Sequence, residues 1–462
     1  MFVVCACLAL KSALILIDDR VRLFMGDSAT YLGSAVSLQV PPDRSYTYPL
    51  FIRAIAMPFA SISPLLWMQT LCGVATAAMV AWLLRNAFAA RRCVAGCAAM
   101  LVSVDPLQLF YERMVMTESL STCVLVAGLC VAVAYVRSGR LPLLALCVAF
   151  GVVSASLRVG MVPLACVLSI AAVLSRWEAA RRKEFGKHLV IALALTCATH
   201  AAYRYAYGFA THGEAVYIRD GGLFRLGLAA PLVRAEDFDG TRIDADLLNE
   251  VTIPLADETT REAQIWSPGG LIDVLKRHAG AEAYPAASKI ASHAMWRDPI
   301  GVVKLGIATT VDYFDPRLRE MRLYSDLGFG QPPDERTITL LRDHFGYNAS
   351  GLARTPSPMY RYFEANAWWP TACLFALAPL ALVAAFGFAR RNRAALLLAL
   401  VACGLVAGEV LCSHIVSFRY LHPFTVMVLL QGVVIVDGLL RAAVRRRSQI
   451  RNEISPLEAL AT

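Results

Sequence analysis

The chain has 462 residues, of which 57% are hydrophobic and 17% charged, and its mean hydropathy is +0.54. Soluble domains are about half apolar and about a quarter charged, so this composition excludes an ordinary soluble protein and predicts one embedded in a membrane. The net charge of +9 comes from Lys and Arg in short runs between apolar segments. Such runs are typical of cytoplasmic membrane loops and do not support a nucleic-acid partner.

Apolar segments follow one another along the chain, most of them close to the ~20 residues that a helix needs to cross a bilayer. We expect helices at about 2–17, 64–84, 93–110, 118–136, 141–157, 160–175, 188–206, 367–389, 394–413 and 420–440. The sequence therefore predicts an all-α polytopic membrane protein with about ten transmembrane helices. The first segment contains Lys11 and lacks a basic leading region and a small-residue cleavage site, which favours an uncleaved helix over a signal peptide. An alternative is that the natural chain begins upstream of Met1.

Basic residues mark every second loop between these segments. They follow the second, fourth, sixth, eighth and tenth segments, for example at Arg85, Arg137, Lys183, Arg390 and Arg445. Lys and Arg are concentrated in cytoplasmic loops, so these loops and both termini are expected on the cytoplasmic side of a bacterial inner membrane.

This sidedness divides the chain into four parts. Residues 1–206 form an N-terminal membrane core whose first outer loop spans 18–63, residues 207–365 an extracytoplasmic domain of mixed helical and Gly/Pro-rich stretches, residues 366–441 the C-terminal transmembrane helices, and residues 442–462 a cytoplasmic tail. Within the outer domain, the stretch 299–314 is apolar enough to lie along the membrane surface, and a buried core helix is an equal alternative. The 13 cysteines all lie in or beside apolar segments, so we interpret them as small hydrophobes rather than disulfides.

The first outer loop holds a candidate general base. Asp27 lies just beyond the first segment and opens a helix-like run. A carboxylate at this boundary can take a proton from an incoming hydroxyl, although a helix cap or a solvated loop acid is an alternative. Asp18 and Asp19 lie nearer the helix end and compete for the same role.

A second charged group precedes the fourth segment. Glu118 opens that segment, where an acid also stabilises a helix N-terminus, and Glu112 and Arg113 lie just before it. These charges stand at the mouth of an apolar bundle, which is costly unless they face a cavity or a partner.

Arg158 occupies an outer turn between two apolar segments that are too close together for a loop. A lone arginine on the outer side opposes the positive-inside trend and requires an anionic partner. A phosphate suits its planar guanidinium, and an internal ion pair with Glu112 or Glu118 is the alternative.

The last outer turn gathers further polar residues, namely Glu409, His414, Arg419, Tyr420 and His422. Their spacing matches no zinc signature, although a divalent metal stays open. Arg419 as a second phosphate contact is the favoured interpretation.

Five short motifs now stand in order on the outer face: GDSATYL at 26–32, YTYPLF at 46–51, YERMVMTESL at 111–120, SLR at 156–158 and RYLHP at 419–423. Their order and shared sidedness resemble the C-type glycosyltransferase superfamily. The resemblance is closest to bacterial relatives of protein O-mannosyltransferases and of the aminoarabinose transferases that act on lipid A. It covers the membrane core and not the outer domain 208–365.

The resemblance implies a transferase that uses a polyprenyl-phosphate-linked sugar and a lipid, glycan or protein acceptor, with inversion at the anomeric carbon. It implies the following roles: Asp27 and Glu118 catalytic, Arg158, Arg419 and Tyr420 at the donor phosphate, and Tyr31, Glu112, Arg113 and His414 in support. The sequence lacks the adjacent Asp-Glu pair of the mannosyltransferases at Asp27, which leaves mannose unsupported.

Two other classes share this composition. A transporter or lipid flippase is disfavoured because the sequence has no internal repeat and no midplane break in its helices. An O-antigen polymerase or ligase is also polytopic with a large outer loop, and it stays open as an alternative.

Overall fold

The computed structural model of the chain describes all residues except 1, 179–181, 327–331, 353–356, 390–391 and 461–462. Regular structure in the described residues is helical, without a β-strand and with one isolated bridge between Arg22 and Met114. The expected all-α class is confirmed.

Among the described residues, six helices are long and apolar enough to cross a membrane. They are α4 (Ser63–Phe88), α7 (Glu118–Ser138), α10 (Arg182–Thr211), α19 (Trp368–Phe388), α20 (Arg393–Cys412) and α21 (Phe418–Leu460). Shorter apolar helices pack among them: α1 (Phe2–Ile17), α5 (Arg92–Ser103), α8 (Leu141–Leu157) and α9 (Val162–Leu174). A multi-pass membrane protein is therefore confirmed, whereas ten spans remain a prediction.

The segment expected as one helix over 93–110 is instead two, so that prediction is wrong. α5 ends at Ser103, and α6 (Pro106–Tyr111) begins three residues later. Pro106 cannot donate the backbone hydrogen bond that would continue α5. The Asp105 carboxylate accepts a hydrogen bond from the Gln108 backbone N at 2.9 Å and so caps a new helix.

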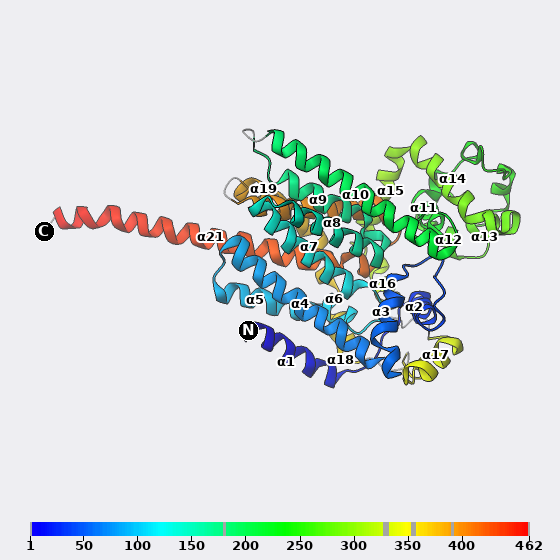
Figure 1. Cartoon of the computed structure of the whole chain (residues 1–462), viewed down its shortest axis with the longest axis horizontal. Helices are drawn as coiled ribbons and strands as arrows, with labels where there is room; N and C mark the ends of the chain where they lie inside the picture. Colours follow the sequence, from blue (N-terminus) through cyan, green and yellow to red (C-terminus); the bar gives the residue numbers. More distant parts are fainter. Residues whose placement is uncertain (1, 179–181, 327–331, 353–356, 390–391, 461–462) are drawn as a thin grey trace.

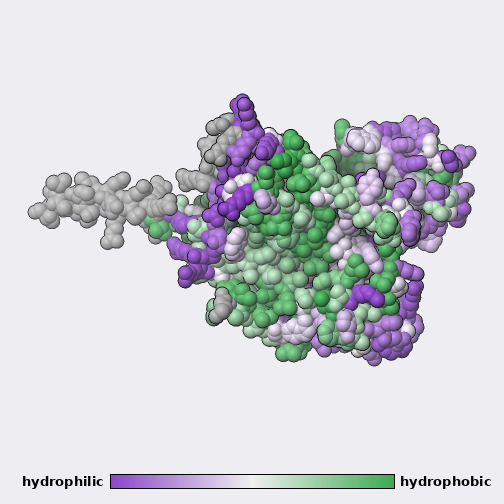
Figure 2. Space-filling model, viewed as in Figure 1, coloured by the Kyte–Doolittle hydropathy of each residue, from purple (hydrophilic) through white to green (hydrophobic). Residues whose placement is uncertain are grey.

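The surface shows how the molecule meets a bilayer. Figure 2 shows a belt of hydrophobic residues between two hydrophilic ends. Large apolar side chains on the spans are exposed, among them Phe375 at 73% and Phe386 at 83% on α19. Apolar exposure on this scale marks a surface that lipid covers.

Different helices lie at the two ends of the belt. In Figure 1, the start of α1 and the C-terminal part of α21 lie toward one end, and the remaining short helices lie toward the other. These short helices are α2 (Met25–Ser37), α3 (Thr47–Ile55), α11 (Gly221–Ala229), α12 (Arg261–Trp266), α13 (Leu271–Ala279), α14 (Ala283–Arg297), α15 (Pro299–Asp312), α16 (Pro316–Asp326), α17 (Glu335–Phe345) and α18 (Pro358–Ala365).

Two hydrophobic cores hold the chain together. The larger core joins the apolar helices and takes in Tyr313, Phe345 and Phe363 from the segment 207–365. The smaller core, from Leu223 to Ala294, belongs to α11–α14 and the turns between them. The helices of 207–365 thus divide between a part with its own core and a part that packs on the membrane helices.

Candidate functional site

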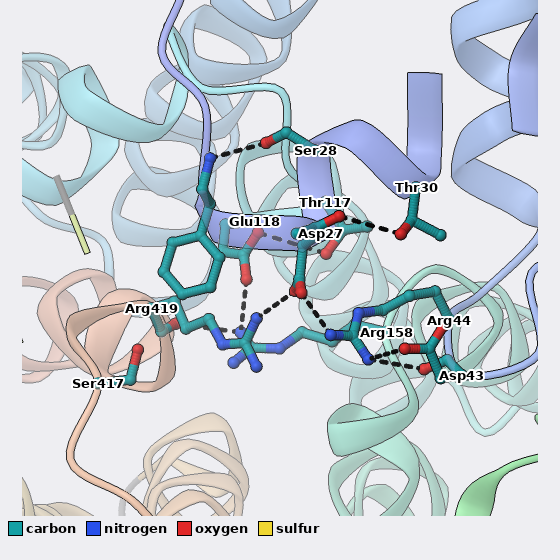
Figure 3. A network of polar contacts seen from close by, with 12 residues as sticks. Asp27, Ser28, Thr30, Asp43, Arg44, Thr117, Glu118, Arg158, Ser417 and Arg419 are labelled. Atoms are coloured by element: carbon teal, nitrogen blue, oxygen red, sulfur yellow. Dashed lines mark hydrogen bonds and ion pairs between the residues drawn. The ribbon is translucent and has the colours of Figure 1, made fainter. Parts of the chain in front are cut away.

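Charged side chains from four distant segments converge at the end of the belt where the short helices lie (Figure 3). Asp27 lies in the first turn of α2, Glu118 is the first residue of α7, Arg158 follows α8, and Arg419 is the second residue of α21. Arg419 Nη1 donates to Asp27 Oδ2 at 2.7 Å. Arg158 Nη1 lies 3.7 Å from Glu118 Oε1 and donates to the backbone oxygen of Arg419 at 3.1 Å. These four residues, each singled out from the sequence, form one contiguous group, which we call the charged cluster.

Asp27 is an acid of the charged cluster that binds two arginines. Its carboxylate is 6% exposed and accepts hydrogen bonds from two arginines, Arg419 and Arg44. Burial raises the pKa of Asp27, but the charges of Arg44 and then Arg419 outweigh burial, so that the net pKa is lowered. Asp27 is therefore ionised at neutral pH and cannot take up a proton readily while both arginines hold it.

Arg44 is a member of this group that the sequence interpretation missed. Besides Asp27, its guanidinium pairs with Asp43 at 3.1 Å. It also lies over the rings of Phe224 and Trp266, at 5.5 and 5.9 Å from their centroids. Arg44 lies in the expected outer loop 18–63, where an arginine opposes the positive-inside trend, but Arg20, Arg22 and Arg53 lie in the same loop and nothing in the sequence singles out Arg44 among them.

The two arginines nearest the belt share one aromatic ring. The guanidinium carbons of Arg158 and Arg419 each lie 5.0 Å from the ring centroid of Tyr420, and Arg419 Nη2 donates to the Tyr420 hydroxyl at 3.1 Å. Cation–π contacts of this kind stabilise guanidinium groups that have left bulk water. The ring therefore holds two positive charges side by side.

Two of these arginines keep unused donors. The Nε atoms of Arg44 and Arg419 are buried and have no hydrogen-bond partner among the described residues. A buried N–H without an acceptor is unfavourable, and an anionic ligand supplies acceptors of the right kind. The charged cluster is therefore suited to bind a phosphate.

Two other acids considered for this site bind residues outside the charged cluster. From the sequence, Asp18 was an alternative to Asp27 as the base, and Glu112 was an alternative partner of Arg158. Asp18 Oδ2 lies 3.3 Å from Arg22 Nη2 and also accepts from the Met359 backbone N. Glu112 pairs with Lys11 at 2.6 Å rather than with Arg158. Of the two internal partners considered for Arg158, the structure therefore brings Glu118 into contact.

The expected supporting residues lie at differing distances from the charged cluster. The Tyr31 ring is buried and meets Tyr48 edge-on at 5.0 Å, and burial followed by the charge of Asp27 raises the pKa of Tyr31. His414 is buried beside the Phe224 ring, with centroids 6.4 Å apart. Arg113 donates to Thr70 Oγ1 at 3.1 Å, away from the charged cluster. The structure thus brings Tyr31 close to Asp27 and leaves Arg113 apart.

A buried chain of hydrogen bonds lies behind the charged cluster. Gln108 donates to Glu112 at 2.7 Å, and Gln108 Oε1 lies 3.0 Å from His422 Nε2, whose other ring nitrogen lies 3.2 Å from Thr122 Oγ1. Together with the ion pair of Lys11 and Glu112, it connects α1, α6, α7 and α21. His422 follows Arg419 by three residues, so this chain fixes the helical turn that carries Arg419.

Two further features bear on ligands. Within the described part of the chain, no three His, Cys, Asp or Glu side chains gather closely enough to hold a metal ion.

A cavity of about 480 Å³ lies between α17 and α2, the helix that carries Asp27 of the charged cluster. Its lining residues include Thr30, Ser34, Gln39 and Thr337. Asp334 and Arg336 also line it, so the cavity suits a polar ligand that offers hydrogen-bonding groups.

Comparisons with known proteins add the following. No family model matches the sequence, and no curated protein matches it significantly. Two solved structures of ArnT from Cupriavidus metallidurans, one in the apo state and one bound to undecaprenyl phosphate, are similar at 16% and 17% identity. The matches cover 92% of this chain and 76% and 77% of ArnT, with TM-scores of 0.36 and 0.34.

ArnT is the lipid A aminoarabinose transferase, a C-type glycosyltransferase, and so belongs to the superfamily that the sequence motifs resemble. Identities and TM-scores this low carry no argument about activity.

Proposed function

We propose that this protein is a membrane glycosyltransferase that moves a sugar from a polyprenyl phosphate to an acceptor hydroxyl. The observation that carries this proposal is the convergence of Asp27, Glu118, Arg158 and Arg419 at the end of the hydrophobic belt. A lipid-linked phosphate reaches such a place with its chain among the helices and its headgroup among the arginines.

The donor phosphate binds to Arg158 and Arg419 beside Tyr420. The unused Nε donor of Arg419 and the planar fork of both guanidinium groups supply hydrogen bonds to phosphate oxygens. Negative charge grows on the phosphate as it leaves, and fixed positive charges in a water-poor site stabilise that charge most in the transition state.

Asp27 is the general base. The acceptor oxygen forms a bond with the anomeric carbon, the bond from this carbon to the phosphate oxygen breaks, and the hydroxyl proton passes to Asp27. Polyprenyl phosphate is the leaving group, and one in-line displacement inverts the anomeric configuration. Glu118 keeps Arg158 in place through their 3.7 Å contact.

The remaining assignments follow the pattern of charges. We place the charged cluster at the outer face of a bacterial inner membrane, with both termini in the cytoplasm, because basic residues occupy alternate loops on the opposite side. Residues 207–365 then form the outer domain, between the membrane core 1–206 and the C-terminal helices 366–441, with 442–462 as a cytoplasmic tail. The acceptor's hydroxyl-bearing part fits the cavity beside α2.

The donor site is tested by binding of undecaprenyl phosphate to the purified protein, measured by native mass spectrometry. Arg158→Gln and Arg419→Gln are each expected to weaken binding at least about tenfold, since a charge-assisted hydrogen bond contributes about 1.5–3 kcal/mol. Arg225→Gln, at an exposed arginine of the outer domain, is the matched control and should bind like the wild type. Equal binding by all four proteins would refute the donor site.

The base is tested in cells by mass spectrometry of the envelope glycolipids and glycans. Cells that express Asp27→Asn should lose the sugar modification that the wild type adds, while the purified variant still binds undecaprenyl phosphate. A variant that retains the modification shows that Asp27 is not the base. A wild type that moves undecaprenyl phosphate across vesicles and adds no sugar would instead indicate a flippase.

A further inference from the structure

One helix next to the membrane core presents an apolar face to the outside. On α15, the side chains of Ile300, Val303, Ile307 and Val311 are 68, 39, 49 and 60% exposed, and Phe314 just beyond the helix is 44% exposed. Their spacing of three and four residues places them on one side of the helix. We call these five residues the apolar stripe.

The opposite side of α15 is firmly attached to the protein. A Cβ at Gly306 would overlap the backbone oxygen of Val410, so α15 and α20 pack with their backbones in contact. The buried Arg261 of α12 donates to the hydroxyl of Thr309 and to the backbone oxygen of Leu305. α15 therefore holds a fixed position, and the exposure of the apolar stripe is not that of a loose segment.

The contacts of α15 also fix its level relative to the spans. Val410, against Gly306, is two residues from the end of α20, and Phe314 meets Phe375 at 6.4 Å, seven residues into α19. At 1.5 Å per residue, both contacts lie within about 10 Å of the helix ends. That depth corresponds to the boundary between headgroups and acyl chains.

The apolar stripe is continuous with the lipid-facing surface. Phe375, which Phe314 touches, belongs to the exposed face of α19. Lys304 is exposed at the edge of the apolar stripe, where its ammonium group can reach lipid phosphates while its methylene chain stays among apolar groups. Trp296, at 85% exposure just before α15, is a residue type enriched at membrane interfaces.

We propose that α15 is an interfacial helix whose apolar stripe is covered by the acyl chains of the outer leaflet. The bilayer is its partner, and the helix lies between the lipid and the helices α11–α14. The charged cluster is thereby held at a set height above the lipid surface. This inference does not depend on the reaction that the protein catalyses.

The experiment places a diazirine-bearing amino acid at one position of the full-length protein in vesicles of phosphatidylethanolamine and phosphatidylglycerol. Illumination at position 307 should give lipid adducts, detected by intact mass spectrometry, as should position 386 on the exposed face of α19. Position 276, an exposed lysine of α13, is the matched control and should give none. Exposed sites are chosen so that the photoreactive side chain does not disturb the fold.

Three outcomes decide the proposal. Lipid adducts at 307 and 386 but not at 276 support it. Adducts at 386 alone would show that α15 stays in water and overturn it. A crosslink from position 307 to a protein in place of lipid would overturn it as well, because the apolar stripe would then be a protein-binding surface.

Discussion

Gly73 of α4 offers a sharp test of the buried ion pair between Lys11 and Glu112. A Cβ at position 73 would overlap Oε1 of Glu112 and lie 2.8 Å from Gln108 Nε2. Both charged side chains are fully buried, with no exposed surface. Gly73→Ala therefore forces the Glu112 carboxylate to move away from Lys11, or the helices to separate.

The expected magnitude follows from two opposing effects. Separating a buried ion pair leaves an uncompensated charge, which destabilises a protein by about 3–5 kcal/mol. Alanine favours a helix over glycine by about 1 kcal/mol. The first effect is larger, so Gly73→Ala should lower stability by roughly 2–4 kcal/mol. The measurement is the midpoint of thermal unfolding of the purified protein in detergent.

The matched control is Gly408→Ala in α20, where a Cβ would have no heavy atom within 4 Å. This substitution should leave stability unchanged or raise it by up to about 1 kcal/mol. A triple variant with Gly73→Ala, Glu112→Ala and Lys11→Met removes both charges and should recover part of the loss. If Gly73→Ala unfolds at the temperature of Gly408→Ala, Glu112 yields without losing its partner and the reasoning is wrong.

Two further predictions concern the protonation of Asp27 and His414. Arg44→Gln removes one of the two charges that lower the pKa of Asp27, so this pKa should rise in an infrared titration, with Asp27→Asn identifying the carboxyl band. An unchanged titration would contradict the ion pair. His414 has a pKa lowered to about 3, mainly by burial and then by nearby arginines. Its unfolded pKa is about 6.5, so only the unfolded chain takes up this proton between these values, and stability should fall as pH falls below 6.5. From pH 7.5 to 5.5 this proton uptake should lower the free energy of unfolding by about 1.4 kcal/mol. The His414→Gln variant should lack this part of the pH dependence. Parallel declines of wild type and variant in thermal unfolding would refute that assignment.

The parts of the site that sequence alone could predict share a physical cause. Ionisable residues at the ends of apolar segments are costly unless they have a partner, so Glu118, Arg158 and Arg419 stood out. Sidedness placed them on one face, and the structure brings them together. Lys11 lies within the first apolar segment, but nothing in the spacing identifies Glu112, 101 residues away, as its partner.

The parts that sequence could not predict depend on tertiary packing. Arg44 reaches Asp27 across 17 residues because the chain turns back after α2 ends at Ser37 and brings the loop before α3 to the start of α2. The aromatic rings that hold Arg44 come from α11 and α12, which belong to the smaller hydrophobic core. Hydropathy also merged α5 and α6 into one segment because both are apolar, although Pro106 marked the break.

The double ion pair at Asp27 gives the proposed reaction an order. A carboxylate held by Arg44 and Arg419 is a weak base, which conflicts with the proposed role of Asp27 only if both contacts persist. A donor phosphodiester competes with Asp27 for Arg419, since its two anionic oxygens accept from both nitrogens of a guanidinium fork. Losing one arginine raises the proton affinity of Asp27. In the proposed reaction, Asp27 therefore becomes a competent base when the donor is bound, and Arg44, held by the rings of Phe224 and Trp266, keeps the carboxylate oriented toward the incoming hydroxyl.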